Sequence, residues 1–131
     1  MDGATTERAQ GVCPTDWHIP SDCEWMYLEN SLGMTTADQQ LTGFRDSGTV
    51  GSKLKSSTFG GTNSSGFTAL ISGFRYTNGA FYNRNAYGFW WTSSIASASL
   101  PHVRRMDTSQ AGIGRDGNTK DQAYSIRCLK D

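Results

Sequence analysis

The chain has 131 residues, of which 36% are hydrophobic and 18% charged, and it contains 15 glycines. This length suits one domain over residues 1–131, and the scarcity of charged residues argues against a helical bundle and favours short strands, turns and irregular backbone. Twelve basic residues balance twelve acidic ones, so a net charge of zero excludes an overall field that would attract nucleic acid or an anionic membrane.

The first segment does not resemble a leader sequence. Residues 1–12 contain no apolar stretch of the kind found in signal peptides. No run of about 18 apolar residues occurs anywhere in the chain, so we expect no direct membrane insertion.

Two helices follow in the N-terminal third. Ser21 with Glu24 fits a capping box, and a glycine at position 33 can end the helix, which predicts a helix over about residues 22–32. Thr36 with Gln39 offers a second, weaker capping box for a short helix that stops before residue 43. We predict no further helices.

The middle of the chain predicts a loop followed by short strands. Residues 43–66 are rich in Gly, Ser and Thr, but apolar anchors interrupt them, which favours a long loop fixed to the body over a linker. Asn78–Gly79 is a hairpin signal between two of the strands. The strands are predicted at residues 67–71, 74–76, 80–82 and 89–92. The loop anchors are Val50, Leu54 and Phe59.

The last forty residues alternate as half-buried strands do. A strand over residues 102–107 would place His102, Arg104 and Met106 on one face and the intervening residues on the other. Ile113 and Arg115 likewise share a face. Residues 123–129 complete the pattern and predict a closing strand.

The three cysteines leave at least one thiol unpaired within the chain. Their spacing at Cys13, Cys23 and Cys128 excludes a CxxC redox pair and a compact zinc knuckle. Two interpretations stay open: one disulfide, between Cys13 and Cys128, or reduced and buried thiols throughout.

Four sequence runs carry a family resemblance. They are CPTDWHIPSDCEW at 13–25, GTNSSGFTAL at 61–70, GFWWTSS at 88–94 and YSIRCLKD at 124–131. Together the runs resemble the Fibrobacter succinogenes major paralogous domain. That family is similar to the formylglycine-generating-enzyme type of C-type-lectin-like fold, and many members are variable proteins of diversity-generating retroelements. The resemblance implies an α+β fold with two helices, a small, mostly antiparallel sheet and extensive loops, in which the N- and C-terminal segments lie near each other.

The resemblance also implies a variable surface within about residues 95–118. In such proteins a retroelement randomises adenine-containing codons while the scaffold stays constant. The positions that match scaffold residues are Trp90, Trp91, Arg104, Met106, Ile113, Arg115, Tyr124, Ile126 and Cys128. The positions that match variable, ligand-binding residues are Ser97, Ser99, Leu100, Val103, Arg105, Asp107, Ser109, Gln110, Gly114, Asp116 and Gly117. Pro101 and His102 stand where the family commonly has Ala-Trp, which questions where the local strand starts.

Sharper chemical hypotheses compete with structural ones. Trp90–Trp91 suggests a platform for sugar rings, but adjacent strand residues point to opposite faces, which favours one ring in the core and the other packed under a loop. Tyr76, Phe81 and Tyr82, like Tyr87 and Phe89, are expected mainly to fill the body, with one or two bordering the binding face. The Glu-Pro-Asn and Trp-Asn-Asp runs of calcium-dependent lectins are absent, so we expect no metal and no cofactor.

The predicted function is recognition of a protein or glycan ligand, outside the cell or on a cell or virion surface. A structural or adhesive module without diversified residues is the alternative. A copper-dependent oxidase of the formylglycine-generating type is a remote one, since neither histidine nor any cysteine belongs to a catalytic motif. We therefore expect no enzyme. The sequence does not fix the oligomeric state, and a monomer is the default expectation.

Overall fold

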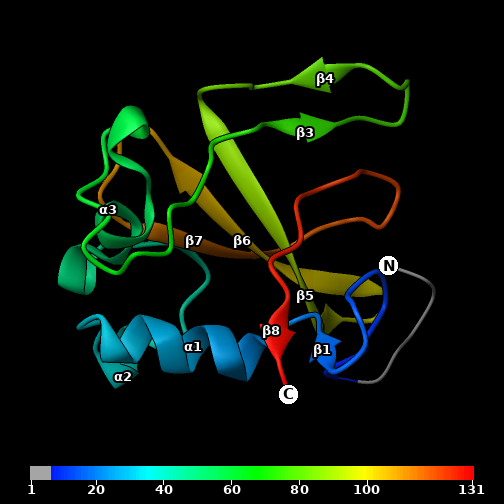
Figure 1. Cartoon of the computed structure of the whole chain (residues 1–131), viewed down its shortest axis with the longest axis horizontal. Coiled ribbons are helices and arrows are strands. Elements are labelled where there is room, and N and C mark those ends of the chain that lie inside the picture. Colours follow the sequence, from blue (N-terminus) through cyan, green and yellow to red (C-terminus); the bar gives the residue numbers. More distant parts are fainter. Residues whose placement is uncertain (1–6) are drawn as a thin grey trace.

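A four-stranded antiparallel sheet carries most of the fold. In the computed structural model, which describes residues 7–131, its strand order is β2 (Gly43–Arg45), β7 (Ile113–Gly117), β6 (Leu100–Asp107) and β5 (Tyr87–Ser97). Two further sheets have two strands each, and Figure 1 shows one of them as a hairpin at the top, opposite the helices α1 and α2 at the bottom. They pair β1 (Trp17–His18) with β8 (Leu129–Lys130) and β3 (Phe74–Arg75) with β4 (Phe81–Tyr82). The predicted α+β class is confirmed.

The first two helices form where the sequence predicts them. Helix α1 (Asp22–Ser31) has the expected capping box: the Glu24 amide donates to Ser21 Oγ at 3.2 Å, and the Ser21 amide donates to Glu24 Oε2 at 2.9 Å. Helix α2 (Thr36–Gln39) is capped by Thr35, whose hydroxyl oxygen accepts from the Asp38 amide at 3.2 Å. The predicted Thr36–Gln39 box is therefore wrong by one residue.

A third helix lies inside the segment predicted to be loop. Helix α3 (Val50–Leu54) follows a 3₁₀ turn, η1 (Ser47–Thr49), and precedes another, η2 (Ser57–Phe59). Val50 and Leu54 are four residues apart and fully buried, so burial of one helix face outweighs the poor helix propensity of the segment. Gly51 serves close packing, because a Cβ there would lie 1.8 Å from the Gly112 carbonyl oxygen.

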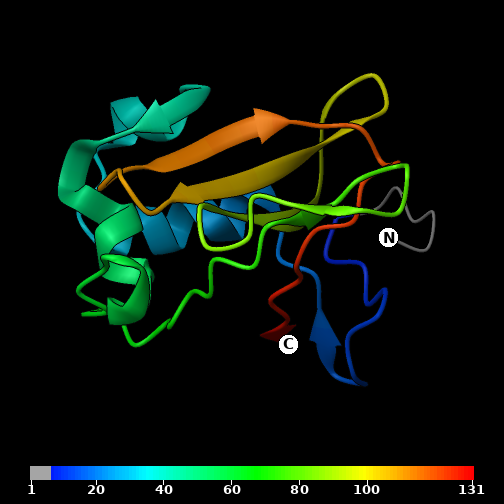
Figure 2. The same cartoon turned by 90° about the horizontal axis from the view of Figure 1, so that it is seen from above.

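The core lies between the sheet, α1 and α3. It joins Trp25 of α1 to residues from α3, β5, β6 and β7, and Figure 2 shows α1 running along one face of the sheet. Residues 67–71, predicted as a strand, keep the alternation, with Ala69 and Ile71 buried and Leu70 61% exposed. They form only an isolated bridge between Ala69 and Lys55, so the strand prediction is wrong because no partner strand lies beside them.

The terminal segments lie side by side, as expected. Trp17 pairs with Lys130 in the β1–β8 sheet, and a disulfide joins Cys13 to Cys128. The disulfide interpretation is therefore confirmed. The predicted closing strand at 123–129 reduces to β8 and single bridges at Ala123 and Ser125. Residues 1–6 lie outside the described residues. The predictions for residues 1–12 and for a domain over 1–131 therefore lie partly outside the described residues as well.

The long β5–β6 hairpin extends beyond the predicted limits. Strand β6 begins at Leu100 and includes both Pro101 and His102, so the residues that differ from the family pattern do not delay the strand. The proline lies where the β5–β6 register is irregular, between Trp91 and Ile95 on β5, so a missing amide donor is tolerated there. Among the described residues, no helix has the length and apolar character needed to cross a membrane.

Candidate functional site

Strands β6 and β7 separate scaffold residues from the predicted variable residues by face. Arg104 and Met106 are fully buried on the face toward α1, as is Ile113 of β7. The intervening residues Val103 and Arg105 point to the outer face. This is the alternation predicted from the sequence, and it follows from the period of two in a strand.

A buried ionic network fixes the inner face to α1. The Glu29 carboxylate accepts hydrogen bonds from both terminal nitrogens of Arg45 at 2.8 Å and from Nε of Arg104 at 2.6 Å. The Asp22 carboxylate accepts hydrogen bonds from Nη1 of Arg104 at 2.7 Å and from Nη2 of Arg115 at 2.6 Å. Burial alone would raise the pKa of Asp22, but hydrogen bonds from Arg115 and Arg104 outweigh it and lower that pKa to about 2. The two scaffold arginines thus share the carboxylate of Asp22 in the interior.

The tryptophan pair fills both sides of β5. Trp90 belongs to the main core, while Trp91 lies on the outer face, where its ring centroid is 4.6 Å from that of Tyr124. Both tryptophans are 4% exposed, so the core interpretation is confirmed and neither ring offers a free face to a sugar.

Four predicted variable residues gather at the β5–β6 turn. Ser97 and Ser99 are exposed, and Leu100 is half-buried. Gly117, the last residue of the neighbouring strand β7, lies next to Leu100. These four residues are called the first-turn patch. Its mixture of small polar groups and one leucine suits contact with a partner surface.

Two predicted residues remain accessible in the middle of the outer face. Arg105 Nη2 lies 3.6 Å from Asp116 Oδ2, and its guanidinium carbon lies 4.6 Å from the centre of the Phe44 ring. Both charged side chains are half-buried, and they form the strand patch.

Two neighbouring positions do not lie on the surface. Val103 is 1% exposed, because it pairs across the strands with Trp91, over which Tyr124 packs. Gly114 is buried beneath Arg105, whose Cβ would lie 3.2 Å from a Cβ at that position. Their expected exposure is therefore wrong.

The remaining predicted residues occupy the β6–β7 turn. Ser109 and Gln110 are exposed and form the second-turn patch. Asp107 is only 7% exposed, because its Oδ1 accepts from the Ser109 amide at 2.7 Å and from the Ser109 hydroxyl at 2.8 Å. The expectation that Asp107 would be exposed is therefore also wrong, and its carboxylate instead shapes the turn.

A buried lysine supports the second turn from below. Lys55 is 1% exposed, and its Nζ donates to the carbonyl oxygens of Asp107 at 2.5 Å and Gln110 at 2.7 Å. Burial lowers the pKa of Lys55, partly offset by Asp107. Sequence reasoning missed this residue, since nothing local marks a lysine at the end of a glycine-rich segment as buried.

The two turns lie at opposite ends of β6, so the residues predicted to form one surface divide among three patches. Comparison with known proteins places the chain in a family: the model of the Fibrobacter succinogenes major domain matches residues 3–130. The chain belongs to the Fibrobacter succinogenes major domain family. No match was found among curated proteins or among solved structures.

The cysteines, histidines and acidic residues of this Fibrobacter succinogenes major domain are the side chains that could form a metal site or a disulfide. No group of three or more His, Cys, Asp or Glu side chains there could hold a metal ion. The Cys13–Cys128 disulfide leaves Cys23, exposed at the start of α1, as the free cysteine of the described chain. His18 is buried, with Nδ1 2.6 Å from Asp131 Oδ1 and Nε2 3.0 Å from Glu24 Oε1.

The hairpin of this family domain exposes aromatic rings that were expected mainly in the body. Phe81 is 67% exposed, and Tyr76 and Tyr82 are each 43% exposed. The β3–β4 hairpin projects from the sheet, so its rings pack on one another, as in the 6.0 Å contact of Phe74 with Tyr82. Phe89 is buried, as predicted.

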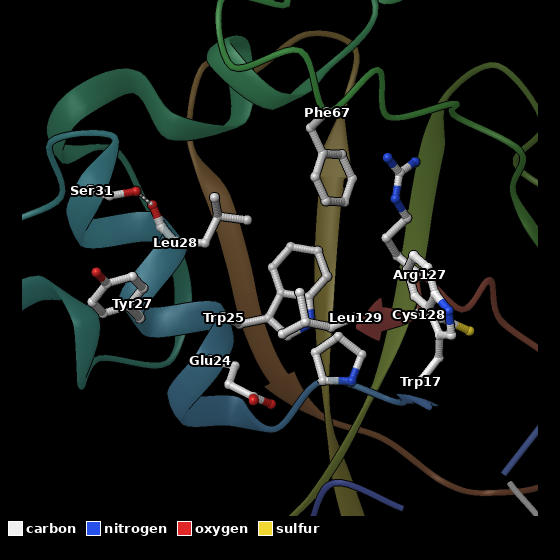
Figure 3. A pocket seen from close by; sticks show the side chains of 11 residues that line it. Trp17, Glu24, Trp25, Tyr27, Leu28, Ser31, Phe67, Arg127, Cys128 and Leu129 are labelled. Carbon is white, nitrogen blue, oxygen red and sulfur yellow. Dashed lines mark hydrogen bonds between the residues drawn. The ribbon is translucent and has the colours of Figure 1, made fainter. Parts of the chain in front are cut away.

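An apolar groove between α1 and β8 was also missed. Figure 3 shows α1 on one side, with Trp25 and Leu28, and Leu129 with Trp17 on the other. The hollow has a volume of about 490 Å³. Tyr27 of α1 also lines the hollow and is 80% exposed, which no local pattern in the sequence indicates.

Proposed function

We propose that this domain is a ligand- or receptor-binding module whose exposed turn residues differ among copies, as in the target proteins of diversity-generating retroelements. The observation that carries the proposal is the separation of roles along β6 and β7. Residues of the two turn patches are exposed or half-exposed, whereas Arg104, Met106 and Ile113 between them are fully buried. Side chains in the patches can therefore change with little effect on the core.

Besides the bonds from Ser109 to the Asp107 carboxylate, the second turn is held by main-chain contacts that do not depend on the side chains of Ser109 and Gln110. Lys55 binds two carbonyl oxygens, and the Ser52 amide donates to the Ala111 carbonyl oxygen at 2.9 Å. Substitutions at Ser109 and Gln110 leave these main-chain groups in place. Such a support suits a surface that keeps its shape while its chemistry changes.

A C-type-lectin-like fold of the formylglycine-generating-enzyme type is part of the same proposal. Three features support it: the paired terminal strands β1 and β8, helix α1 against the central sheet, and the long irregular segments between elements. We propose no catalytic role and no cofactor.

The partner is a protein or glycan met outside the cell or on a cell or virion surface. The first-turn patch offers hydroxyl groups and Leu100, and the strand patch adds a paired arginine and aspartate, a mixture common in protein interfaces. The disulfide supports an oxidising compartment, where such bonds persist.

Two matched libraries test the proposal. The first randomises the exposed Ser97, Ser99, Ser109 and Gln110, and the second randomises the buried Trp90, Arg104, Met106 and Ile113. We expect most members of the first library to resist proteolysis as the parent does, since surface substitutions usually change stability by less than about 0.5 kcal/mol. Most members of the second should be degraded.

Binding is then selected from the first library against a panel of proteins and glycan arrays. Binders whose affinity depends on the randomised turn positions would support the proposal. The proposal would be refuted if members of both libraries were degraded equally, or if binding affinity did not change with the residues at the randomised turn positions. Among natural close copies, differences spread evenly over the chain would favour the structural or adhesive alternative.

A further inference from the structure

The groove beside α1 continues along the C-terminal segment as three neighbouring hollows. The first, of about 490 Å³, shares Phe67 and Arg127 with a second of about 310 Å³. The second shares Ser72 and Ser125 with a third of about 380 Å³ near the β3–β4 hairpin. The hollows therefore follow residues 123–129 in order, on the flank of the molecule away from the turn patches.

The walls of the groove are mainly apolar and partly open to solvent. Trp17 is 37% exposed, Leu129 42% and Leu70 61%, and the first hollow ends on the buried ring of Trp25. Exposed apolar residues are ordinary when they are scattered, but here they line three adjacent hollows that share lining residues, which is typical of a contact site.

The charges along the groove do not cancel. Glu24 at one end forms an ion pair with Arg8, whose Nε lies 3.3 Å from Glu24 Oε1. Arg127 forms no ion pair with any residue in 7–131. Its guanidinium carbon lies 4.6 Å from the centre of the Phe67 ring, and Figure 3 shows the two side chains next to each other. Arg75, in the third hollow, likewise has no carboxylate partner among these residues. A ligand that fits this groove brings negative charge.

We propose that the groove binds an extended polypeptide segment of a partner protein, with apolar side chains in the hollows and acidic side chains against Arg127 and Arg75. A series of hollows along one segment suits an extended chain, in which side chains on the same face repeat about every 7 Å, better than a single small molecule. The partner's acidic groups complement the guanidinium groups of Arg127 and Arg75, neither of which pairs with a carboxylate within residues 7–131. This contact is separate from the proposed variable surface.

The test uses fluorescently labelled peptides of about nine residues, long enough to follow the groove at about 3.3 Å per residue. One peptide alternates leucine or phenylalanine with glutamate, and the other has lysine in place of each glutamate. Fluorescence anisotropy with the disulfide-bonded chain should show saturable binding of the glutamate peptide, about fivefold tighter than the lysine peptide. Arg127→Glu should remove this preference, and Trp17→Ala should weaken both peptides.

Lys130→Glu is the matched control, because it makes the same charge change on an exposed residue of β8 that does not line the groove. It should leave the preference unchanged, and near-ultraviolet circular dichroism should show that all variants are folded. The proposal is overturned by absence of saturable binding, or by equal effects of Arg127→Glu and Lys130→Glu. Stoichiometric binding of decanoate without binding of either peptide would also overturn it, in favour of a small amphiphilic ligand.

Discussion

The buried charged residues show how single side chains organise this domain. Arg45, Arg104 and Arg115 each face a carboxylate of α1, so none of these cations is buried without a partner. Breaking such a network leaves an uncompensated charge in the interior, which is far more costly than losing a surface ion pair. The alternation of residues 102–107 predicted that Arg104 points inward. Its partners Asp22 and Glu29, which lie 82 and 75 residues away in sequence, could not be predicted from that pattern.

The low pKa of Asp22 predicts acid sensitivity. The folded-state pKa of about 2 lies below the ordinary 3.8, so ionised Asp22 stabilises the fold above about pH 4, and this contribution is lost as pH falls toward 2. Urea denaturation should show the stability difference between the parent and Asp22→Asn shrinking by about 2 kcal/mol from pH 5 to pH 2. The exposed Asp121→Asn is the control. A difference that stays constant over this range would contradict the role given to Asp22.

At the level of elements, the β6–β7 turn depends on a helix that precedes it by more than fifty residues. Helix α3 presents Gly51 to the main chain of Gly112, and the residue after the helix, Lys55, reaches the carbonyl groups of the turn. The glycine-rich composition of residues 43–66 predicted a loop, yet its buried anchors make it the support of the second-turn patch. The packing of α3 therefore places a patch that the chain reaches much later.

Replacing Lys55 should loosen that turn. Lys55→Met removes both hydrogen bonds while keeping most of the side-chain volume, so two carbonyl groups lose their charged donor. We expect the free energy of unfolding to fall by about 2 kcal/mol. Hydrogen exchange, followed by mass spectrometry, should accelerate at residues 108–112. Lys120→Met, on an exposed lysine, should change neither quantity. Unchanged exchange in the turn would show that Lys55 does not hold it.

At the level of the whole molecule, contacts between the two terminal segments close the fold. The β1–β8 pairing, the Cys13–Cys128 disulfide and the contact of His18 with Asp131 all join these segments. Closure brings β8 next to α1 and so creates the groove that we propose as a peptide site. The turn patches and this groove thus depend on different parts of one architecture.

Removing the disulfide should lower stability substantially. The bond joins cysteines separated by 115 residues, so its loss releases a long loop in the unfolded chain. We expect Cys13→Ser with Cys128→Ser to reduce the free energy of unfolding by about 4 kcal/mol in guanidinium chloride titrations. Cys23→Ser, at an exposed free cysteine, serves as the control and should have little effect. Equal stability of all three proteins would mean that the remaining terminal contacts suffice.

The sequence by itself determined the features that depend on neighbouring residues. The Ser21–Glu24 cap starts α1, the period of two turns Arg104 and Met106 inward, and the family runs identify the domain. Each of these signals arises within a few residues, where backbone geometry links side-chain type directly to conformation.

Only the tertiary structure decided which outward residues meet solvent and which are covered. Val103 and Arg105 point to the same face of β6, yet Tyr124 packs over the ring beside Val103, while Arg105 stays half-exposed. Whether a distant segment crosses a given strand depends on the path of the whole chain, and the alternation of residues along one strand contains no information on that path. For the same physical reason, the support of the second turn and the groove beside α1 became evident only in three dimensions.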